Sequence, residues 1–513
     1  MKLGIDVGGT NTDAVLLDGH AVLSSAKAPT SPDVTRGIVE AIQAAAGERD
    51  LSRIEAVLIG TTHFINAITQ ARGLTEVAAI RIATPPQTLP PMVDWPADLA
   101  RALGRHVFVV RGGSQFDGRL LNPLDEDGLR EIATEIRGLG LTQVALSSVF
   151  SPVNGEAEER AAVILLEELP GVSVTSSAEL GRIGILEREN AAILNAALRP
   201  LAEEVVGGFE RVLQDLGIAA PIYLSQNDGT LMSLDEARRY PIRTIASGPT
   251  NSMRGAAFLS GVEDTLVVDI GGTTADIGVL RGGFPRESTV AVSLGGVRSN
   301  FRMPDVLSLG IGGGSVVHDD GRRVGPDSVG YRLTSEALVF GGDTLTLTDI
   351  AVAAGLADIG DASRVADVPE SVVQAALADV RTRIGLAIDQ AKLAAADLPV
   401  VVVGGGGVVI DELPGVTTLL RPAHSGVANA VGAAFAQVGG EVDKIYTLAE
   451  MTRAQVVSDA REEAVRRAVK AGAVPETVRI VDTEDVPLTH MAGGTALRVK
   501  AKAIGELRRE EGN

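Results

Sequence analysis

The sequence predicts an α/β protein made of two related halves with a ligand cleft between them. The first observation is an internal repeat, because residues 6–13 (DVGGTNTD) return as residues 269–276 (DIGGTTAD). An apolar stretch precedes and follows each copy, so each copy is expected to form a strand, a tight turn and a second strand. The second observation is that short apolar runs alternate with helical patterns between the copies, which is typical of α/β proteins.

Length and composition agree with more than one domain. At 513 residues the chain exceeds the size at which a single hydrophobic core stops growing. Apolar residues make up 45% of the chain and charged residues 22%, as in an ordinary globular enzyme. Aromatic residues make up only 3%, so we expect the cores to consist of Val, Ile, Leu and Ala.

The predicted elements follow the chain in order. The first part contains strands at 56–59, 107–110, 144–149 and 222–224 and helices at 35–46, 156–169 and 191–216. A Pro-rich stretch at 85–96, which includes Trp95, is typical of a surface loop. After the second copy come a glycine cluster at 310–315, a helix at 371–396, a strand at 400–403, a helix at 427–436, and a tail with a helix and strands at 477–486 and 496–503.

These elements predict three segments. Residues 1–188 and 189–440 are expected to form the two related domains, and residues 441–513 a small C-terminal α+β extension for which the sequence suggests no role. The boundary near residue 188 is placed there because the long predicted helix at 191–216 lies about midway along the chain.

Charge and cysteine content exclude several classes of function. The net charge of −20 repels nucleic-acid backbones and anionic lipids, so neither is expected as a partner. The chain has no Cys, which excludes disulfides, thiolate catalysis and iron–sulfur chemistry. The charged Asp6 lies where a signal peptide would have its apolar core, and no apolar run reaches the ~18 residues of a membrane span. We therefore expect a soluble, cytoplasmic protein.

The two repeated loops are suited to a polyphosphate. A turn through Gly-Gly-Thr brings backbone N–H groups close to a ligand with no Cβ in the way. Each turn leads into a strand and not into a helix, and neither the P-loop pattern nor the dinucleotide fingerprint is present. Asp6 and Asp269 end their strands and suit a hydrated Mg²⁺ beside phosphates. We therefore predict a site for ATP and Mg²⁺.

Further candidate residues follow from the same reasoning. Asp13 and Asp276 are candidates for orienting a metal-bound or attacking water, although an Asx cap of the turn explains them as well. The strand at 400–403 ends in four glycines, against which adenine or ribose can lie, although a simple turn has the same pattern. The residues expected to contact the cofactor are Gly8, Gly9, Thr10, Asn11, Gly271, Gly272, Thr273, Thr274, Gly404, Gly405, Gly406 and Gly407.

The order of these motifs resembles the actin-like ATPase superfamily. In the sequence, the two aspartate loops are followed by the glycine-rich strand end and then by a helix of small residues. This resemblance implies two ribonuclease-H-like domains with ATP between them.

Shorter strings resemble one branch of that superfamily, the hydantoinase A and 5-oxoprolinase family. The similarity covers roughly residues 3 to 435. The strings are at residues 12–16 (TDAVL), 60–62 (GTT) with 66–67 (NA), 187–188 (ER) with 195–196 (NA), 225–229 (SQNDG) with 247–249 (SGP), and 310–315 (GIGGGS) with 324–326 (VGP). The sequence departs from the family pattern at His63, in the stretch from Tyr331 to Gly342, and in a shorter C-terminal region.

The family resemblance implies an ATP-dependent hydrolase subunit that phosphorylates and opens a cyclic amide, such as hydantoin, 5-oxoproline or a related lactam. It also implies a second enzyme subunit, while a homo-oligomer stays open. His63 is then a candidate catalytic residue that faces the substrate. Asn227 and Asp228 either line the cleft or form an ordinary turn. The alternatives are a small-molecule kinase, the ATPase subunit of a ketone carboxylase, and an ATP-driven conformational switch.

Overall fold

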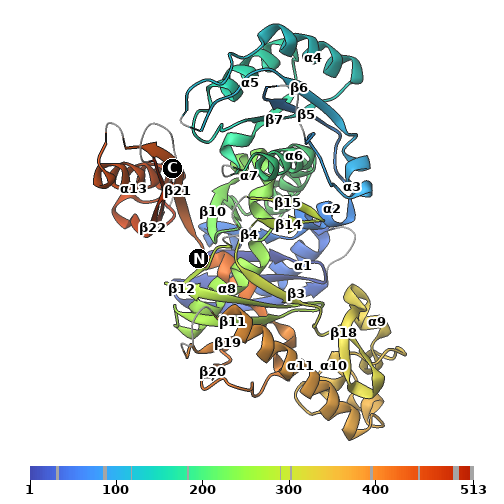
Figure 1. Cartoon of the computed structure of the whole chain (residues 1–513). Coiled ribbons are helices and arrows are strands. Elements are labelled where there is room, and N and C mark those ends of the chain that lie inside the picture. The colour runs from blue at the N-terminus through green and yellow to red at the C-terminus, as the bar shows by residue number, and fades with distance from the viewer. Residues whose placement is uncertain are drawn as a thin grey trace.

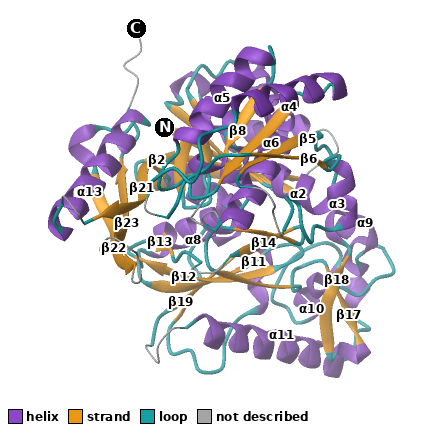
Figure 2. Ribbon diagram, turned by 45° about the horizontal axis from the view of Figure 1, so that its top comes forward, coloured by secondary structure: helices purple, strands orange, loops and turns teal. Residues whose placement is uncertain are grey.

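The computed structural model describes residues 1–29, 34–84, 89–116, 118–181, 184–288, 291–300, 303–392, 397–448, 451–488 and 496–508. These residues form an α/β molecule with mixed sheets, as the sequence predicts (Figure 1). Helices pack around the strands of the sheets (Figure 2). Both copies of the repeat form the predicted strand, turn and strand.

The first large sheet collects strands from distant parts of the chain. Its order in the described residues is β22-β23-β21-β10-β9-β4-β1-β2-β3. β1 and β4 are parallel and fully or almost fully buried, because elements cover both of their faces. The strands are β1 (Lys2–Val7), β2 (Asn11–Asp18), β3 (Ala21–Pro29), β4 (Ala56–Thr61), β9 (Ile222–Ser225), β10 (Thr230–Ser233), β21 (Gln437–Thr447), β22 (Arg479–Leu488) and β23 (Ala496–Gly505).

One core packs this sheet mainly against α1 (Val34–Ala46), α2 (His63–Gln70) and α6 (Ile185–Asp215), and Leu99, Ala100 and Ala237 from two short helices also belong to it. The short helix α7 (Leu234–Arg239) follows β10 and packs against α6. As the composition predicts, aliphatic side chains and Ala make up most of this core.

The second large sheet has the order β13-β12-β11-β19-β20, with β16 also paired to β12. Its strands are β11 (Thr265–Ile270), β12 (Ala275–Arg281), β13 (Phe284–Pro285), β16 (Val306–Leu309), β19 (Val400–Val403) and β20 (Leu419–Leu420). Helices α10 (Leu347–Ala353) and α11 (Glu370–Ala391) contribute to its core. Two hairpins lie outside the large sheets: β14 (Val292–Leu294) with β15 (Val297–Ser299), which contributes to the first core, and β17 (Ser315–His318) with β18 (Arg323–Ser328), which contributes to the second. The short helix α9 (Leu333–Glu336) follows β18.

Two crossing helices lie between the large sheets. α8 (Ser247–Ser260) packs on β11, β12 and β19, whereas α12 (Ala428–Phe435) packs on β1, β2 and β4. Their backbones touch: a Cβ on Gly255 would collide with the carbonyl of Ala428, and one on Gly432 with the carbonyl of Asn251. This close contact fixes the position of the first turns of both helices.

The part of the chain between α2 and α6 forms a separate parallel sheet. Its order is β6-β5-β7-β8, and it packs against α4 and α5. The expectation for Trp95 is wrong, because its side chain is 7% exposed and its Nε1–H donates to Asn190 Oδ1 at 2.9 Å. The elements are β5 (Val77–Ile82), β6 (His106–Val110), β7 (Gln143–Ser148), β8 (Ser173–Ser176), α3 (Ala97–Ala102), α4 (Glu126–Leu139) and α5 (Glu156–Glu168).

The tail forms the predicted helix, α13 (Arg453–Lys470), and the two predicted strands, β22 and β23. The sequence did not reveal β21, through which these strands join the first sheet. Buried Lys502 Nζ also reaches across to Asp228 Oδ2 at 2.9 Å. The proposed boundary at 188 falls near the start of α6 and that at 440 falls inside β21, and the division into three segments stays a prediction.

Candidate functional site

The two aspartate loops have the same geometry in each half. Asp6 pairs with Asp13 across β1 and β2, and Asp269 pairs with Asp276 across β11 and β12. The turns are closed in the same way, by Gly8 N–H donating to the Asn11 carbonyl at 3.0 Å and by Gly271 N–H donating to the Thr274 carbonyl at 2.9 Å. The repeat in the sequence is therefore a repeat in the structure.

The loops lie next to each other. A Cβ placed on Gly272 would be 3.2 Å from Thr10 Oγ1, so the second loop touches the first. The predicted glycine cluster binds the backbone of the second loop. Gly313 N–H donates to the Gly271 carbonyl at 3.0 Å, and Gly314 N–H donates to the Gly272 carbonyl at 2.7 Å. The two halves thus meet at the predicted phosphate-binding turns.

Asp6 and Asp269 each lie next to a glycine at the end of the adjacent parallel strand. A Cβ on Gly60, at the end of β4, would lie 2.7 Å from Asp6 Oδ1. Gly404 follows β19 with φ +83°, and a Cβ there would collide with Asp269 Oδ1. These two glycines leave room for the carboxylates. Of the four glycines at 404–407, Gly405 has open space where a Cβ would point, with no atom of the described residues within 4 Å.

The carboxylate of Asp6 is buried and that of Asp269 is partly buried, both at high electrostatic cost. Burial, reinforced by the charge of Asp13, raises the pKa of Asp6 to about 6, although a hydrogen bond from Asn429 Nδ2 to Asp6 Oδ2 at 3.3 Å opposes the shift. Burial raises the pKa of Asp269 to about 7, with Ser252 acting in the opposite direction. A cation that binds both groups would relieve this cost.

The second Asp of each loop has a partner on a neighbouring strand. Lys27 Nζ on β3 lies 2.7 Å from Asp13 Oδ1 and 2.9 Å from its Oδ2. Ser308 Oγ on β16 donates to Asp276 Oδ1 at 2.5 Å. Burial raises the pKa of both Asp13 and Asp276. Both carboxylates thus bond across the sheet, and the site gains a cation, Lys27, that the sequence analysis did not identify.

Another repeat was also missed. Residues 247–251 (SGPTN) at the start of α8 match residues 425–429 (SGVAN) at the start of α12 in the pattern Ser-Gly-x-x-Asn. Asn429 bonds Asp6, whereas the amide of Asn251 faces the Cα of Gly60. A comparison of the two halves beyond the aspartate loops could have found both Asn residues.

His63 lies beside the first loop, at the start of α2. Its Nδ1 is 2.5 Å from Thr61 Oγ1, and burial lowers the pKa of its imidazole. Thr62 N–H donates to the Val7 carbonyl at 3.1 Å, which ties this stretch to the strand of Asp6. A neutral ring at this position can accept or donate a hydrogen bond to a nearby substrate.

Asn227 and Asp228 stabilise the structure outside the loops. Asn227 Nδ2 donates to the Ile242 carbonyl at 3.1 Å, and its Oδ1 accepts from Ala246 N–H at 2.7 Å. Asp228 pairs with Lys502, and the Lys502 ammonium holds the pKa of Asp228 well below its usual range despite burial. The ordinary-turn interpretation therefore fits these two residues better than the cleft-lining one.

The residues at the loops fit a hydrated magnesium nucleotide. Their donors are carboxylate and hydroxyl oxygens, which Mg²⁺ prefers, and Asp6 Oδ1 is buried with no hydrogen-bond partner among the described residues. A Cβ on Gly9 would meet no described atom within 4 Å, so the turn is open for a phosphate. The described residues contain no group of three or more His, Asp or Glu that could hold a metal alone.

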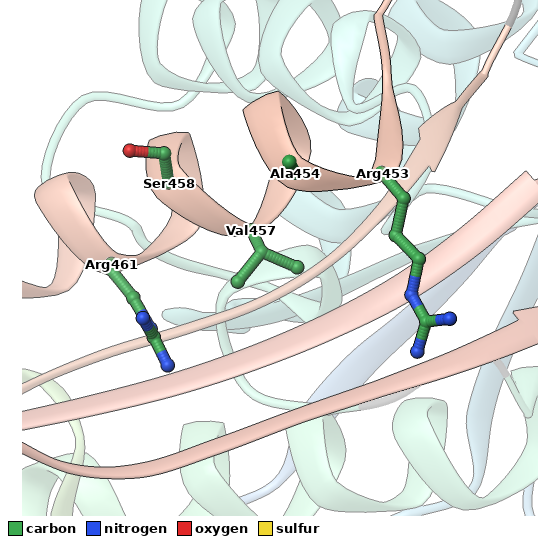
Figure 3. Close-up of a pocket in the computed structure, with 5 residues that line it drawn as sticks. All are labelled: Arg453, Ala454, Val457, Ser458 and Arg461. Carbon is green, nitrogen blue, oxygen red and sulfur yellow. The ribbon is translucent and has the colours of Figure 1, made fainter.

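A surface hollow of about 590 Å³ lies on α13, away from the loops (Figure 3). Arg453 at its edge pairs with Asp485, and Arg461 Nε donates to Thr483 Oγ1 at 3.1 Å. This hollow contains none of the predicted site residues.

No helix in the described part of the chain has the length and apolar character needed to span a membrane.

Comparisons with known proteins agree with this geometry. The family described as "Hydantoinase/oxoprolinase N-terminal region" matches residues 2–169, and the family described as "Hydantoinase/oxoprolinase" matches residues 188–358. The chain is 30% identical to caprolactamase subunit alpha of Pseudomonas jessenii over 70% of this chain and 55% of that protein. It is 28% identical to the acetophenone carboxylase gamma subunit of Aromatoleum aromaticum over 69% of this chain and 53% of that protein.

The chain thus spans about half the length of these curated relatives. The crystal structure of the ATP-dependent caprolactamase from Pseudomonas jessenii matches with a TM-score of 0.80 and 21% identity, covering 99% of this chain and 88% of that chain. This match supports the fold, which is of the actin-like ATPase type. Because the two family matches together cover most of the chain, this protein belongs to the hydantoinase/oxoprolinase family.

Proposed function

We propose that this chain is the ATP-cleaving subunit of an enzyme that phosphorylates and opens a cyclic amide, such as hydantoin, 5-oxoproline or a related lactam. The observation that carries the proposal is that equivalent hairpins present Asp6, which is buried, and Asp269, which is partly buried, and that the turns of these hairpins touch at Thr10 and Gly272. The family membership and the caprolactamase relative support the class of substrate.

The two loops offer the groups that a magnesium nucleotide needs. Backbone N–H groups of the two turns and the hydroxyls of Thr10 and Thr273 would bind the phosphates, and Asp6 and Asp269 would hold Mg²⁺ through its waters. When bound, Mg²⁺ would neutralise charge on the phosphates and on these carboxylates. Lys27, whose side chain is 42% exposed and pairs with Asp13, would add a second positive charge beside the first loop. Phosphoryl transfer needs mainly this positioning and neutralisation.

The proposed reaction uses the amide oxygen as the nucleophile. That oxygen bonds to the γ-phosphorus of ATP while the bond from the γ-phosphorus to the β,γ-bridging oxygen breaks, so ADP leaves. A water molecule then adds to the phosphorylated amide carbon, and the C–N bond breaks as the nitrogen takes up a proton, which leaves an acyl phosphate. A second water molecule cleaves the acyl phosphate to the carboxylate and inorganic phosphate. Neutral His63, held by Thr61, is the residue proposed to orient the substrate. Asp13 and Asp276 are proposed to orient water.

A second subunit is part of the proposal. Two of the relatives are named as enzyme subunits, caprolactamase subunit alpha and the acetophenone carboxylase gamma subunit. A partner chain would then supply the groups that complete ring opening.

A ketone carboxylase is the second candidate, favoured by the 28% identity to the acetophenone carboxylase gamma subunit. In that case the phosphorylated oxygen is that of a carbonyl and the nucleophile is carbon. The same two aspartates would hold ATP, so the nucleotide site does not distinguish the two reactions.

The test is ADP release by the purified chain with Mg²⁺ and ATP, alone and with hydantoin, 5-oxoproline, caprolactam or acetophenone plus bicarbonate. Each substrate is tested with and without the product of the neighbouring gene. The proposal predicts that a lactam stimulates ADP release and that the ring-opened acid accumulates only with the partner. The Asp269→Asn variant is the control that should lose stimulation. If ADP release is stimulated by acetophenone plus bicarbonate and by none of the lactams, the result would support the carboxylase. A stable phosphorylated small molecule would indicate a kinase.

A further inference from the structure

Asn251 has a buried amide whose position has no structural explanation. The side chain is 0% exposed, and neither Nδ2 nor Oδ1 has a hydrogen-bond partner among the described residues. Buried polar groups are nearly always paired, because leaving them unpaired is costly. Asn251 cannot move away easily, since its backbone carbonyl packs directly on Gly432 of α12. The fold therefore holds an unsatisfied amide at a fixed position.

This position is next to the carboxylate of Asp6. A Cβ placed on Gly60 would be 2.5 Å from Asn251 Nδ2 and 2.7 Å from Asp6 Oδ1, so both atoms flank the Cα of Gly60. Asp6 Oδ1 is itself unpartnered among the described residues. The other carboxylate oxygen, Oδ2, accepts a hydrogen bond from Asn429. One side of Asp6 is thus satisfied by the protein, and the other side and the Asn251 amide both lack a partner.

The next residue on α8 has an unsatisfied polar group as well. Ser252 is fully buried, and its Oγ has no hydrogen-bond partner among the described residues. Two adjacent residues of one helix therefore present unpaired buried polar groups between the two sheets. Because α8 packs on the second sheet and crosses α12, which packs on the first, a ligand held by Asn251 would join the two halves.

We propose that Asn251 is a ligand-positioning residue whose side-chain amide bonds an oxygen atom of the bound magnesium nucleotide and holds it against Asp6. That oxygen belongs either to a water on the metal or to a phosphate, and both present the same hydrogen-bonding chemistry to an amide. This inference rests on the proposed function, because it requires that the two loops bind a magnesium nucleotide.

The test compares Asn251→Leu with Asn227→Leu. Both are buried Asn residues, but the amide of Asn227 is bonded at both ends to the Ile242 carbonyl and the Ala246 N–H. Melting temperature without ligand is measured for each variant, and the affinity for AMP-PNP is measured by isothermal titration calorimetry, with Mg²⁺ and with EDTA. Asn251→Ala, which adds no bulk, is measured in parallel in case Leu disturbs the packing.

For Asn251→Leu or Asn251→Ala we expect a melting temperature no lower than that of the wild type, and an affinity for magnesium AMP-PNP weakened about tenfold or more. For Asn227→Leu we expect a fall of about 4 °C or more with affinity retained. A loss of affinity that vanishes in EDTA assigns the oxygen to a metal-bound water, and a loss that persists assigns it to a phosphate.

Wild-type affinity in both Asn251 variants would overturn the inference, and so would a fall in melting temperature as large as that of Asn227→Leu with affinity unchanged. Failure of the wild-type chain to bind magnesium AMP-PNP is a different result, because it would refute the proposed function itself.

Discussion

Replacing Asp6 by Asn should make the ligand-free protein more stable at high pH. Burial raises the pKa of Asp6 from 3.8 to about 6, so the folded state binds a proton more tightly than the unfolded state. Stability is therefore lost as pH rises from about 4 to about 6, as the carboxyl ionises in a buried place. At 1.36 kcal/mol per pKa unit, the ionised Asp6 carboxyl lowers the free energy of unfolding of the wild type by about 3 kcal/mol at pH 8 and by about 1 kcal/mol at pH 4.5. Asn is nearly isosteric and can still accept from Asn429.

The assay is the free energy of unfolding in urea at pH 4.5, 6 and 8 for the wild type and for Asp6→Asn. The stability gained by the variant should grow by about 2 kcal/mol between pH 4.5 and pH 8. Asp228→Asn is the matched control: Lys502 lowers the pKa of Asp228, so this variant should be less stable at pH 8. A loss of stability for Asp6→Asn at pH 8, or a gain that does not change with pH, would refute the reasoning.

Three further changes have defined outcomes. Gly60→Ala places a Cβ 2.5 Å from Asn251 Nδ2 and 2.7 Å from Asp6 Oδ1, so it should cost about 1–3 kcal/mol of unfolding free energy and weaken nucleotide binding. Gly138→Ala, whose Cβ meets no atom of the described residues within 4 Å, should do neither, and equal melting temperatures of the two variants would contradict this. Lys502→Met leaves the Asp228 charge buried without its partner and should lower the free energy of unfolding in urea by about 3–5 kcal/mol. Adding Asp228→Asn should restore much of that stability, and a double variant no more stable than Lys502→Met would argue against the ion pair. Lys27→Met should slow ADP release about a hundredfold, and unchanged turnover would exclude Lys27 from the site.

The repeat was the strongest feature in the sequence because its physical requirement is local. A tight turn through two glycines between apolar strands needs no knowledge of the rest of the chain, and both hairpins formed as predicted. The long helices and the valine strand at 400–403 were also recognisable from their own periodicity and burial. The family strings then identified the fold and family.

The features that were missed depend on contacts between distant segments. Lys27 meets Asp13 only through the register of β2 and β3, and nothing near residue 27 marks it as a site residue. Asn251 and Asn429 share a pattern that the sequence contains, but only the packing of their helices between the sheets shows that both lie near Asp6. Trp95 was expected at the surface because prolines surround it, but a partner 95 residues away, Asn190, holds its indole inside.

The central claim is that Asp6 and Asp269 together hold the metal of one magnesium nucleotide. The most direct measurement is anomalous scattering from Mn²⁺ in crystals of the chain grown with Mn²⁺ and AMP-PNP. The account predicts one Mn²⁺ between the two carboxylates, bound directly or through water, with the phosphates against the turns at Gly8 and Gly271. Nucleotide and Mn²⁺ bound elsewhere, for example at Arg453 and Arg461 on α13, with nothing between the two aspartates, would contradict it.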